Sequence, residues 1–428
     1  MSSDVLVIGG GIAGIQAALD LANMGIHVHL VEREPSIGGR MAQLDKTFPT
    51  NDCAICILSP KMAECSRHHN ITLHTYSEVK GVTGSAGDFS VKVLKRARFV
   101  DEDVCTGCLD CVQKCPAKVP DEFDMGLRMR RAIYMYFPQA VPAVVTIDRE
   151  RCLYLTRDRC GICKKICQRG AVDFEQEDRE IALNVGAIVV ATGFDPFDPS
   201  VVRQYGYGQY KDVITSLEYE RLTNAAGPTG GHLLRLSDKK PVKRLGFIQC
   251  VGSRDMKHFQ FCSSACCMYA TKGAIIANEH NREVQSTIFY TDLRAAGKGF
   301  QEYVARAECE YNVTYIRGRV AEITQDENER PIIRYEDTRS GQAGNETVDL
   351  AVLAISLVPR RGAKELAALL EVELDEYDFI RTDPFSLTDI TRPGMFACGY
   401  CRGPADIPES VTQASGAAAL AAEVVMGG

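Results

Sequence analysis

The order of apolar and polar residues near the start of the chain predicts a parallel α/β unit. Residues 4–8 form a short apolar run typical of a buried strand, residues 15–24 suit a helix, and residues 27–31 form a second apolar run. A strand, a helix and another strand in this order are typical of a sheet whose parallel strands are joined by helices.

Similar segments recur along the rest of the chain. The further strands are expected at residues 71–76, 89–95, 185–193, 244–252, 286–290, 350–356 and 394–399. The further helices are expected at residues 270–280 and 408–425. This order predicts that the chain leaves a first α/β domain, builds a second one from about residue 242, and then returns to the first.

A glycine-rich turn joins the first strand to the first helix. Gly9, Gly11 and Gly14 have G-x-G-x-x-G spacing, and Glu32 follows the second strand. Such glycines allow a tight turn, close approach of a pyrophosphate and close packing of helix on strand, while the acid binds a ribose hydroxyl. The pattern predicts an adenine dinucleotide site rather than an ordinary glycine turn. The residues expected to contact the dinucleotide are Gly9, Gly11, Ile12, Ala13, Gly14, Glu32, Arg33, Gly39, Arg40, Met41, Thr192, Gly193, Gly399, Gln413, Ala414 and Ser415.

The second α/β unit lacks a comparable glycine fingerprint. Its first strand is followed by a turn at residues 249–255, which contains a single glycine, Gly252, and a cysteine, Cys250. A pyrophosphate cannot approach that backbone in the usual way. We therefore expect no nicotinamide site there, and the dinucleotide at the start of the chain is expected to be FAD.

Composition narrows the classes of protein that fit. The 428 residues suffice for two or three domains, and a net charge of -7 with dispersed basic residues argues against a nucleic-acid surface. No apolar run approaches the ~20 residues of a membrane helix, and no cationic leader precedes an apolar core. We therefore expect a cytoplasmic protein that meets a membrane only through partners, with most of its 18 cysteines clustered to bind metal.

Eight cysteines between residues 104 and 173 predict a ferredoxin-like insertion with two [4Fe–4S] clusters. The first four have the bacterial ferredoxin spacing C-x2-C-x2-C-x3-C-P, in which the last cysteine binds the neighbouring cluster, and the second four repeat it with a wider first gap. Four-cysteine zinc sites are the alternative. The two predicted ligand sets are Cys105, Cys108, Cys111 and Cys167, and Cys152, Cys160, Cys163 and Cys115.

Two further cysteine groups leave alternatives open. Cys53 and Cys56 form a C-x-x-C pair that fits a redox-active dithiol, a pair of metal ligands or a packed structural pair. A group in the second α/β unit has no common ferredoxin spacing, so a third cluster and free buried cysteines both fit it. That group consists of Cys250, Cys262, Cys266 and Cys267.

Several stretches of the chain resemble the flavoprotein family of heterodisulfide reductase A subunits, and together they span nearly its whole length. The matching stretches are residues 9–14, 38–49, 53–61, 137–142, 262–267 with Lys272, and 403–416. The resemblance implies a thioredoxin-reductase-like α/β flavoprotein with two dinucleotide-binding domains and an inserted ferredoxin domain. It implies an FAD-binding domain at residues 1–97, 181–240 and 349–428, the insertion at residues 98–180, and the second Rossmann-like domain at residues 241–348.

The resemblance also assigns roles to individual residues. It implies that the four cysteines of the second unit hold a third [4Fe–4S] cluster close to the flavin. It places Lys272 near the flavin ring as a catalytic cation, and a solvated helix residue is the alternative. Longer family members carry a further N-terminal region and a C-terminal ferredoxin module, so we expect those electron carriers either to come from other subunits or not to be needed.

We therefore expect an oxidoreductase subunit that transfers electrons between FAD and iron–sulfur clusters, and that is a candidate for electron bifurcation. Expected partners are other subunits of the complex and ferredoxin or a hydrogenase or dehydrogenase module. The short form also resembles the A subunit of the quinone-interacting membrane-bound oxidoreductase. A self-contained NAD(P)H-dependent disulfide reductase that uses Cys53 and Cys56, and a cluster-carrying scaffold, are the other hypotheses.

Overall fold

The computed structural model describes residues 2–427, and these divide into two compact units. Unit 1 comprises Met1–Ala42, Cys56–Phe194 and Pro359–Gly428, and unit 2 comprises Gln43–Ile55 and Asp195–Val358. The chain leaves the first unit, builds the second and returns, as its strand pattern predicts.

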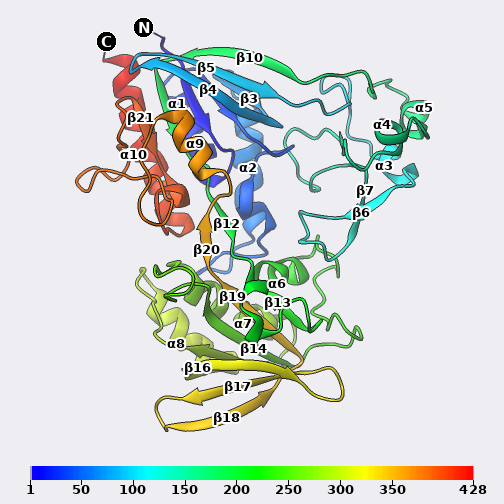
Figure 1. The fold of residues 1–428 in the computed structure, drawn as a ribbon, viewed down its shortest axis with the longest axis vertical. Helices are drawn as coiled ribbons and strands as arrows, with labels where there is room; N and C mark the ends of the chain where they lie inside the picture. The colour runs from blue at the N-terminus through cyan, green and yellow to red at the C-terminus, as the bar shows by residue number, and fades with distance from the viewer. Residues whose placement is uncertain (1, 428) are drawn as a thin grey trace. The chain divides into compact units, whose positions relative to one another are not determined.

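A five-stranded parallel sheet forms the centre of unit 1 (Figure 1). Its strands, in spatial order, are β21 (Met395–Ala397), β11 (Ala187–Val190), β1 (Val5–Ile8), β2 (Val28–Val31) and β3 (Ile71–His74). Every residue of β1 and β11 is buried, as expected of strands covered on both faces. Because β1 is central, the turn that follows it lies at the carboxyl edge of the sheet, where α/β proteins bind ligands.

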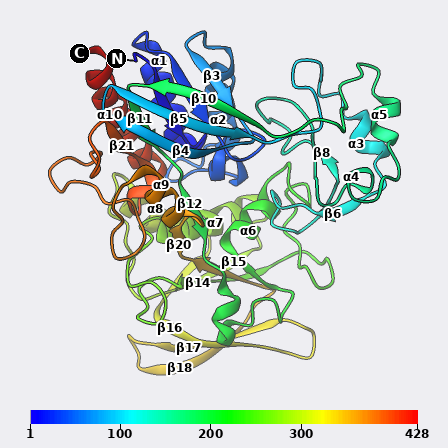
Figure 2. The same ribbon diagram turned by 45° about the horizontal axis from the view of Figure 1, so that its top comes forward.

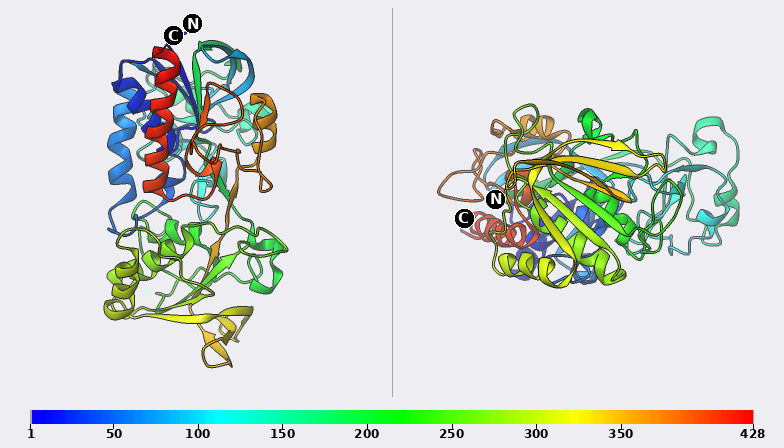
Figure 3. Two further views of the ribbon diagram at one scale, coloured as in Figure 1. Left: turned by 90° about the vertical axis from the view of Figure 1, so that its left-hand side faces the viewer. Right: turned by 90° about the horizontal axis from the view of Figure 1, so that it is seen from below.

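Helices cover one face of this sheet. α1 (Ile12–Asn23) packs along α10 (Ile407–Met426), whose alanines Ala414, Ala417, Ala418 and Ala421 are fully buried and permit close approach. Figure 3 shows α10 beside the helices from the first part of the chain. α10 begins at a capping box in which Asp406 and Glu409 each accept the other's backbone N–H, so its start is well defined. α2 (Ala54–Arg67) lies beside α1, where its Cys65 thiol donates to the Ile15 carbonyl oxygen.

A three-stranded antiparallel sheet covers the other face of the parallel sheet (Figure 2). Its strands are β10 (Arg179–Val185), β5 (Asp88–Lys95) and β4 (Ser77–Ser85). Phe89 and Val91 of β5 pack with Leu6 and Ile8 of β1 in one apolar core. α9 (Ala363–Leu370) adds Ala367 and Leu370 to the same core.

The cysteine-rich insertion has only short elements and a small core of its own. Its helices are α3 (Asp110–Lys114), α4 (Leu153–Arg157) and α5 (Ile162–Ile166). Its strands are β6 (Lys118–Pro120), β7 (Met129–Arg131), β8 (Ile133–Tyr134) and β9 (Thr146–Ile147). α3 packs against α5, so the two cysteine-rich halves meet, as expected of a two-cluster ferredoxin domain.

Unit 2 is built on a seven-stranded mixed sheet. In spatial order its strands are β13 (Val213–Thr215), β19 (Leu350–Ile355), β14 (Arg244–Val251), β15 (Gln285–Tyr290), β16 (Val313–Gln325), β17 (Pro331–Asp337) and β18 (Gln342–Thr347). The first five strands are parallel and the last two are antiparallel. Its helices are α6 (Ser216–Thr223), α7 (Cys266–His280) and α8 (Phe300–Glu310).

Residues 43–55 fold with unit 2, although the boundaries expected from the sequence place them in the FAD-binding domain. Arg221 donates to the Gln43 carbonyl oxygen at 2.9 Å, and Asn224 donates to that of Leu44 at 3.1 Å. Residues 195–240 likewise lie in unit 2, whereas the expected boundary falls at residue 240. The short elements at and near the crossings are β12 (Phe194–Pro196), β20 (Leu357–Pro359) and the 3-10 helices η1 (Gly39–Gln43), η2 (Pro199–Val201), η3 (Arg203–Tyr205) and η4 (Gly399–Arg402).

Candidate flavin and iron–sulfur sites

The three fingerprint glycines have different surroundings in the turn between β1 and α1. A Cβ on Gly9 (φ +108°) would lie 2.4 Å from the Ala191 carbonyl oxygen, and one on Gly14 would lie 1.8 Å from that of Gly9. A Cβ on Gly11 would meet no atom within 4 Å. Gly9 and Gly14 are therefore required for packing, while Gly11 leaves open backbone at a helix N-terminus, where a pyrophosphate can bind.

Glu32 is buried at the end of β2, and backbone N–H groups fix the orientation of both carboxylate oxygens. Oε2 accepts the Gly10 N–H at 2.6 Å, and Oε1 accepts the Glu34 N–H at 2.8 Å. A carboxylate has about four lone-pair sites, so this one can also accept ribose hydroxyls. The position and the remaining acceptor capacity of Glu32 fit the adenosine half of FAD.

Other expected dinucleotide contacts line the same end of the sheet. Gly193 (φ +70°) meets nothing within 4 Å where a Cβ would lie, and the Gly399 N–H donates to Gln413 Oε1 at 2.9 Å. A Cβ on Gly39 would lie 2.8 Å from the Gly11 Cα, so these two turns approach closely. The Ser415 hydroxyl instead donates to Asp20 on α1 at 2.6 Å, which gives it a structural partner.

The remaining expected contacts differ in exposure. Arg33 lies near Glu34, with 3.7 Å between Nε and Oε1, and Ala414 is fully buried in α10. Ile12 and Arg40 are half-buried, so each keeps some accessible surface. The residues that lie buried at the turns are Ala13 and Met41.

Arg360 is a residue of this region that sequence reasoning missed. Its Nη1 donates to the Thr192 carbonyl oxygen at 3.0 Å, and its Nη2 lies 3.7 Å from Glu34 Oε1. Arg360 thus joins the turn at Thr192 to the loop after Glu32 and adds a positive charge beside the glycine turns. Burial raises the pKa of Glu34, and the Glu32 carboxylate adds to the effect.

The segment at residues 137–142 holds the loop that follows Glu32. The Ile37 N–H donates to the Val141 carbonyl oxygen at 3.1 Å, and the Val141 N–H donates to the Ser36 hydroxyl at 2.8 Å. A Cβ on Gly38 would lie 3.3 Å from the Phe137 ring. The connector of the insertion therefore shapes the glycine loop of the FAD-binding domain, which gives this motif a physical role.

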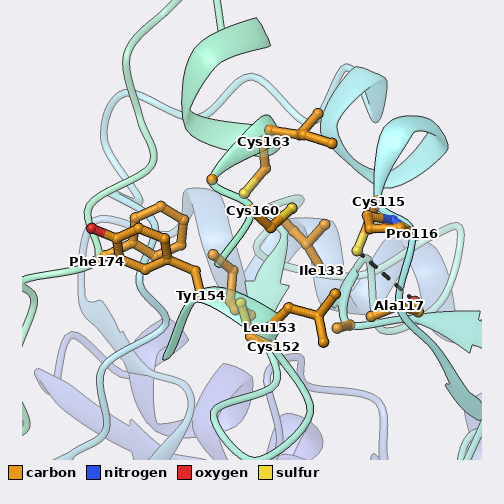
Figure 4. A pocket seen from close by; sticks show the side chains of 14 residues that line it. Cys115, Pro116, Ala117, Ile133, Cys152, Leu153, Tyr154, Cys160, Cys163 and Phe174 are labelled. Carbon is orange, nitrogen blue, oxygen red and sulfur yellow. Dashed lines mark hydrogen bonds between the residues drawn. The ribbon is translucent and has the colours of Figure 1, made fainter. Parts of the chain in front are cut away.

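One predicted cluster site is a cavity lined by four cysteines of the insertion. Cys115 from the first half lies at this cavity with Cys152, Cys160 and Cys163 from the second half, as Figure 4 shows. Ile133, Leu153, Tyr154 and Phe174 supply apolar walls. The cavity brings together the four cysteines of the second predicted ligand set, across the two halves of the insertion.

The other predicted set is partly assembled around Cys111. Burial raises the pKa of the Cys111 thiol to about 12, and the nearby thiols of Cys105 and Cys108 add to the effect. Burial raises the pKa of Cys163 to about 11, with Cys152, Cys115 and Cys160 nearby. Cys163, from the other predicted set, also raises the pKa of Cys111, so the two groups of thiols lie close together and the assignment of the first set stays a prediction.

The spread of the sulfur atoms suits a cluster better than zinc. A tetrahedral zinc ion with Zn–S bonds of 2.3 Å holds its sulfur ligands about 3.8 Å apart. Among residues 2–427, no three cysteine sulfurs lie within 4.8 Å of one another. A [4Fe–4S] cubane binds thiolates at its outer corners and therefore holds them further apart.

The third cysteine group lies where β14 leads into α7 in unit 2. Cys266 and Cys267 occupy the first turn of α7, and the Cys267 sulfur accepts the Arg294 N–H at 3.4 Å. A hydrogen bond from Cys266 lowers the pKa of Cys250 to about 6, and the positive charge of Arg254 adds to the effect. Cys250 and Arg254 both have positive φ angles, 60° and 54°, and such strain is typical of a binding site.

The turn after β14 differs from a dinucleotide-binding turn in what covers it. A Cβ on Gly252 would lie 2.4 Å from the Phe197 ring, so an aromatic side chain occupies the space beside this glycine. The first turn of α7, which would face a pyrophosphate in a dinucleotide fold, carries Cys266 and Cys267. This geometry supports the prediction that unit 2 binds no nicotinamide in the usual way.

Lys272 is buried in α7 and ion-paired, so the interpretation of this residue as a solvated helix residue is wrong. Its Nζ pairs with Glu220 of α6 and donates to the Lys46 carbonyl oxygen at 3.0 Å. The Asp45 N–H donates to the other Glu220 oxygen at 2.9 Å. Burial raises the pKa of Asp45 to about 6, and the Glu220 carboxylate adds to the effect. The catalytic role of Lys272 toward a flavin stays a prediction.

Cys53 and Cys56 are bonded to each other as a disulfide at the start of α2. The bond shows that the two sulfur atoms of the C-x-x-C pair lie close enough to be joined. It is equally the state of a structural pair, so the redox role of these cysteines stays a prediction.

The fold and these sites define a class of protein, a two-domain flavoprotein like thioredoxin reductase with an iron–sulfur insertion. Residues 4–83 match the family of FAD dependent oxidoreductases. The structure resembles the thioredoxin reductase of Lactococcus lactis, with a TM-score of 0.55 and 16% identity, covering 100% of each chain. The predicted fold class is therefore confirmed.

The amino-acid sequence is much more similar to a narrower group of proteins than to these thioredoxin reductases. The chain is 52% identical over 427 residues to the second iron-sulfur A subunit of the CoB–CoM heterodisulfide reductase of Methanopyrus kandleri, covering 99% of this chain and 64% of the relative. It is 47% identical over 420 residues to the A subunit of the H2:CoB–CoM heterodisulfide,ferredoxin reductase of Methanothermobacter marburgensis, covering 97% of this chain and 63% of the relative. The chain is thus similar over nearly its whole length to heterodisulfide reductase A subunits and spans somewhat under two thirds of the length of these relatives.

None of the helices within residues 2–427 combines the length and the apolar character that crossing a bilayer requires.

Proposed function

We propose that this chain is the FAD- and iron–sulfur-containing electron-transfer subunit of a heterodisulfide-reductase-like complex. The cavity shared by Cys115, Cys152, Cys160 and Cys163 carries this proposal, because it joins cysteines from both halves of the insertion as a two-cluster ferredoxin domain requires. The insertion and the glycine turns also lie in the same compact unit, so electrons have carriers within one body.

Electron transfer through this chain needs no hydride donor of its own. A bound flavin exchanges electrons singly or in pairs, while each cluster carries one electron. The glycine turns and Glu32 would hold and orient the dinucleotide, and the cysteines would hold the clusters beside the small apolar core of the insertion. The flavin of this subunit is then the point at which a pair of electrons is divided between two acceptors.

The partners follow from the names of the relatives and belong to the proposal. The relative from Methanothermobacter marburgensis is named for H2, CoB–CoM heterodisulfide and ferredoxin. We extend this to a cytoplasmic complex in which other subunits supply a hydrogenase or dehydrogenase module and a heterodisulfide site, with ferredoxin as a one-electron partner. Any contact with a membrane would come through those subunits.

Cofactor analysis and anaerobic mixing test the proposal. The purified chain should contain one FAD and about twelve irons. A content of about eight irons would contradict the presence of the third cluster. NADH or NADPH should leave the flavin absorbance unchanged for minutes, whereas reduced ferredoxin should bleach it. Prompt bleaching by NADPH would contradict the proposal.

A self-contained disulfide reductase is the second candidate, and the Cys53–Cys56 disulfide favours it. It predicts that NADPH reduces the flavin and that the flavin then reduces this disulfide. Replacement of Cys53 by Ser should abolish turnover with a disulfide substrate in that case. It should leave electron transfer from ferredoxin to the clusters unchanged if the first proposal holds.

A further inference from the structure

Three polar side chains converge at the amino-terminal edge of the parallel sheet in unit 1. Asp4 precedes β1, His27 precedes β2, and His29 lies in β2. One ligand atom from each residue lies within 4.8 Å of those of the other two, and Asp4 Oδ2 faces both His27 Nδ1 and His29 Nε2. Gly9 and Glu32 follow the other ends of the same strands, so this cluster is separate from the dinucleotide site.

The distances in this cluster suit a single metal ion. Asp4 Oδ2 lies 3.0 Å from His27 Nδ1 and 3.4 Å from His29 Nε2. With metal–ligand bonds of about 2.0–2.1 Å, a tetrahedral ion holds adjacent N and O ligands about 3.3 Å apart. The two distances to the Asp4 oxygen therefore already lie near the separation that a tetrahedral ion would impose.

Each histidine also has a partner for its second ring nitrogen. His27 Nε2 lies 3.0 Å from the Thr72 hydroxyl oxygen, and His29 Nδ1 lies 3.2 Å from His74 Nε2. With those nitrogens donating their N–H groups outward, the lone pairs of His27 Nδ1 and His29 Nε2 face Asp4. Metal-binding histidines are usually held in this way by a second layer of hydrogen bonds.

The register of the strands makes this second layer a property of the fold. His29 pairs with Thr72 and Val31 pairs with His74 in the β2–β3 ladder, so Thr72 and His74 share a face of the sheet with His29. The only other polar contact to the Asp4 carboxylate in the described chain is the Ser3 hydroxyl, 3.4 Å from Oδ1. His74 is buried, whereas about a third of the Asp4 and His27 side chains is exposed, which leaves an entry path.

We propose that Asp4, His27 and His29 form a binding site for a divalent transition metal ion of the zinc type. Two imidazoles and one carboxylate suit Zn²⁺, Ni²⁺ or Co²⁺, and solvent completes the coordination. The site is independent of the flavin and the clusters, so its presence or absence leaves the proposed electron-transfer function untouched. The alternative is that these three side chains form a hydrogen-bonded network that binds protons but no metal ion.

Equilibrium dialysis of the holoprotein against Ni²⁺ under anaerobic conditions tests the site. Bound nickel, iron and protein are measured together, so that any exchange into the clusters appears as lost iron. One nickel ion is expected per chain, and His27→Gln and His29→Gln should each weaken its binding at least tenfold. His68→Gln is the matched control, because His68 lies in the same unit outside the cluster, and it should bind nickel as the parent does.

Thr72→Val provides a second variant that leaves all three ligands in place. It removes the partner of His27 Nε2 and should weaken nickel binding about tenfold or more, as loss of a second-layer partner usually does. X-ray absorption at the nickel edge should show nitrogen and oxygen ligands with two imidazoles. Sulfur ligation, or equal nickel binding by the parent and folded His27→Gln protein, would overturn the proposal.

Discussion

Arg98 donates a hydrogen bond from Nη2 to the carbonyl oxygen of Pro35 at 2.7 Å. The guanidinium also donates to Thr75 at 2.6 Å and to Thr146 at 2.9 Å, and it pairs with Glu102. Arg98 is 1% exposed, and Thr146 belongs to the insertion. One buried side chain therefore fastens the insertion to the loop that follows Glu32.

Replacement of Arg98 by Met should destabilise unit 1 by about 3 kcal/mol, because it leaves buried acceptors without donors and Glu102 with only part of its pairing. Urea unfolding followed by circular dichroism under anaerobic conditions measures the change. Arg149→Met is the control, since Arg149 pairs with Asp178 at an exposed position and should cost less than about 1 kcal/mol. Equal effects of the two substitutions would contradict the anchoring role.

Replacement of Gly11 by Ala should abolish FAD binding while the protein still folds. The added methyl meets no protein atom within 4 Å, so the expected loss of stability is only about 1 kcal/mol for the altered helix cap. The same methyl would occupy the space through which a pyrophosphate approaches. Flavin content after reconstitution should fall at least tenfold.

Gly14→Ala is the matched comparison for Gly11→Ala. Its methyl would lie 1.8 Å from the Gly9 carbonyl oxygen, so we expect failure to fold rather than a folded protein without flavin. Normal flavin content in folded Gly11→Ala protein would show that the dinucleotide binds elsewhere.

Cysteine pairs can test how the ligands are shared between the two clusters of the insertion. Cys115 and Cys163 line one cavity, so a Cys115→Ala, Cys163→Ala double variant should lose one cluster, or about four irons. A Cys111→Ala, Cys115→Ala double variant should lose both, or about eight irons. Iron analysis and electron paramagnetic resonance of the reduced protein measure the losses, and Cys309→Ser, at an exposed cysteine, is the control. Equal iron loss in the two double variants would reject the interleaved assignment.

Asp45 should make unit 2 less stable as the pH rises from about 4 to about 6. Its pKa is raised from the ordinary value near 4 to about 6, so the folded state holds a proton that the unfolded state releases in this range. The stability present below pH 4 is lost as the pH rises, and the loss is complete above pH 6. Partial exposure reduces its expected size to about 1 kcal/mol.

The substitution Asp45→Asn should remove this pH dependence. The urea midpoints of the variant and the parent are compared at pH 5, 6 and 7.5. The midpoint of the variant should rise relative to that of the parent as the pH increases. Asp52→Asn, at an exposed position of the same loop, should follow the parent. A constant difference between Asp45→Asn and parent at all three pH values would argue against a raised pKa.

The first strand, turn and helix could be predicted because local rules determine them. An apolar run, glycines at fixed spacing and a following acid depend on neighbours in sequence, and Gly9, Gly14 and Glu32 have the surroundings that the pattern predicts. The helix α7 begins at Cys266, four residues before the predicted start, because its first turn carries cysteines that resemble a loop motif in the sequence.

Long-range contacts explain what the sequence alone could not show. The membership of residues 43–55 in unit 2 depends on backbone carbonyls that accept from Arg221 and Asn224, some 180 positions away. The burial of Lys272 likewise depends on Glu220, which lies 52 positions earlier and has no pattern that marks it as a partner. Arg360 was missed for the same reason, since a single arginine after a buried strand has no local signature.

The ligand sets that cross between the halves of the insertion constrain how this domain can be made and inherited. Because Cys115 completes a site built mainly by Cys152, Cys160 and Cys163, a ribosome must finish the second half before that site has all its thiolates. Each half has four cysteines, but in the predicted assignment neither half alone supplies all four ligands of one cluster. With the predicted assignment of Cys167 to the other set, loss of either half would leave both sites incomplete, so we expect the insertion to be inherited as one unit.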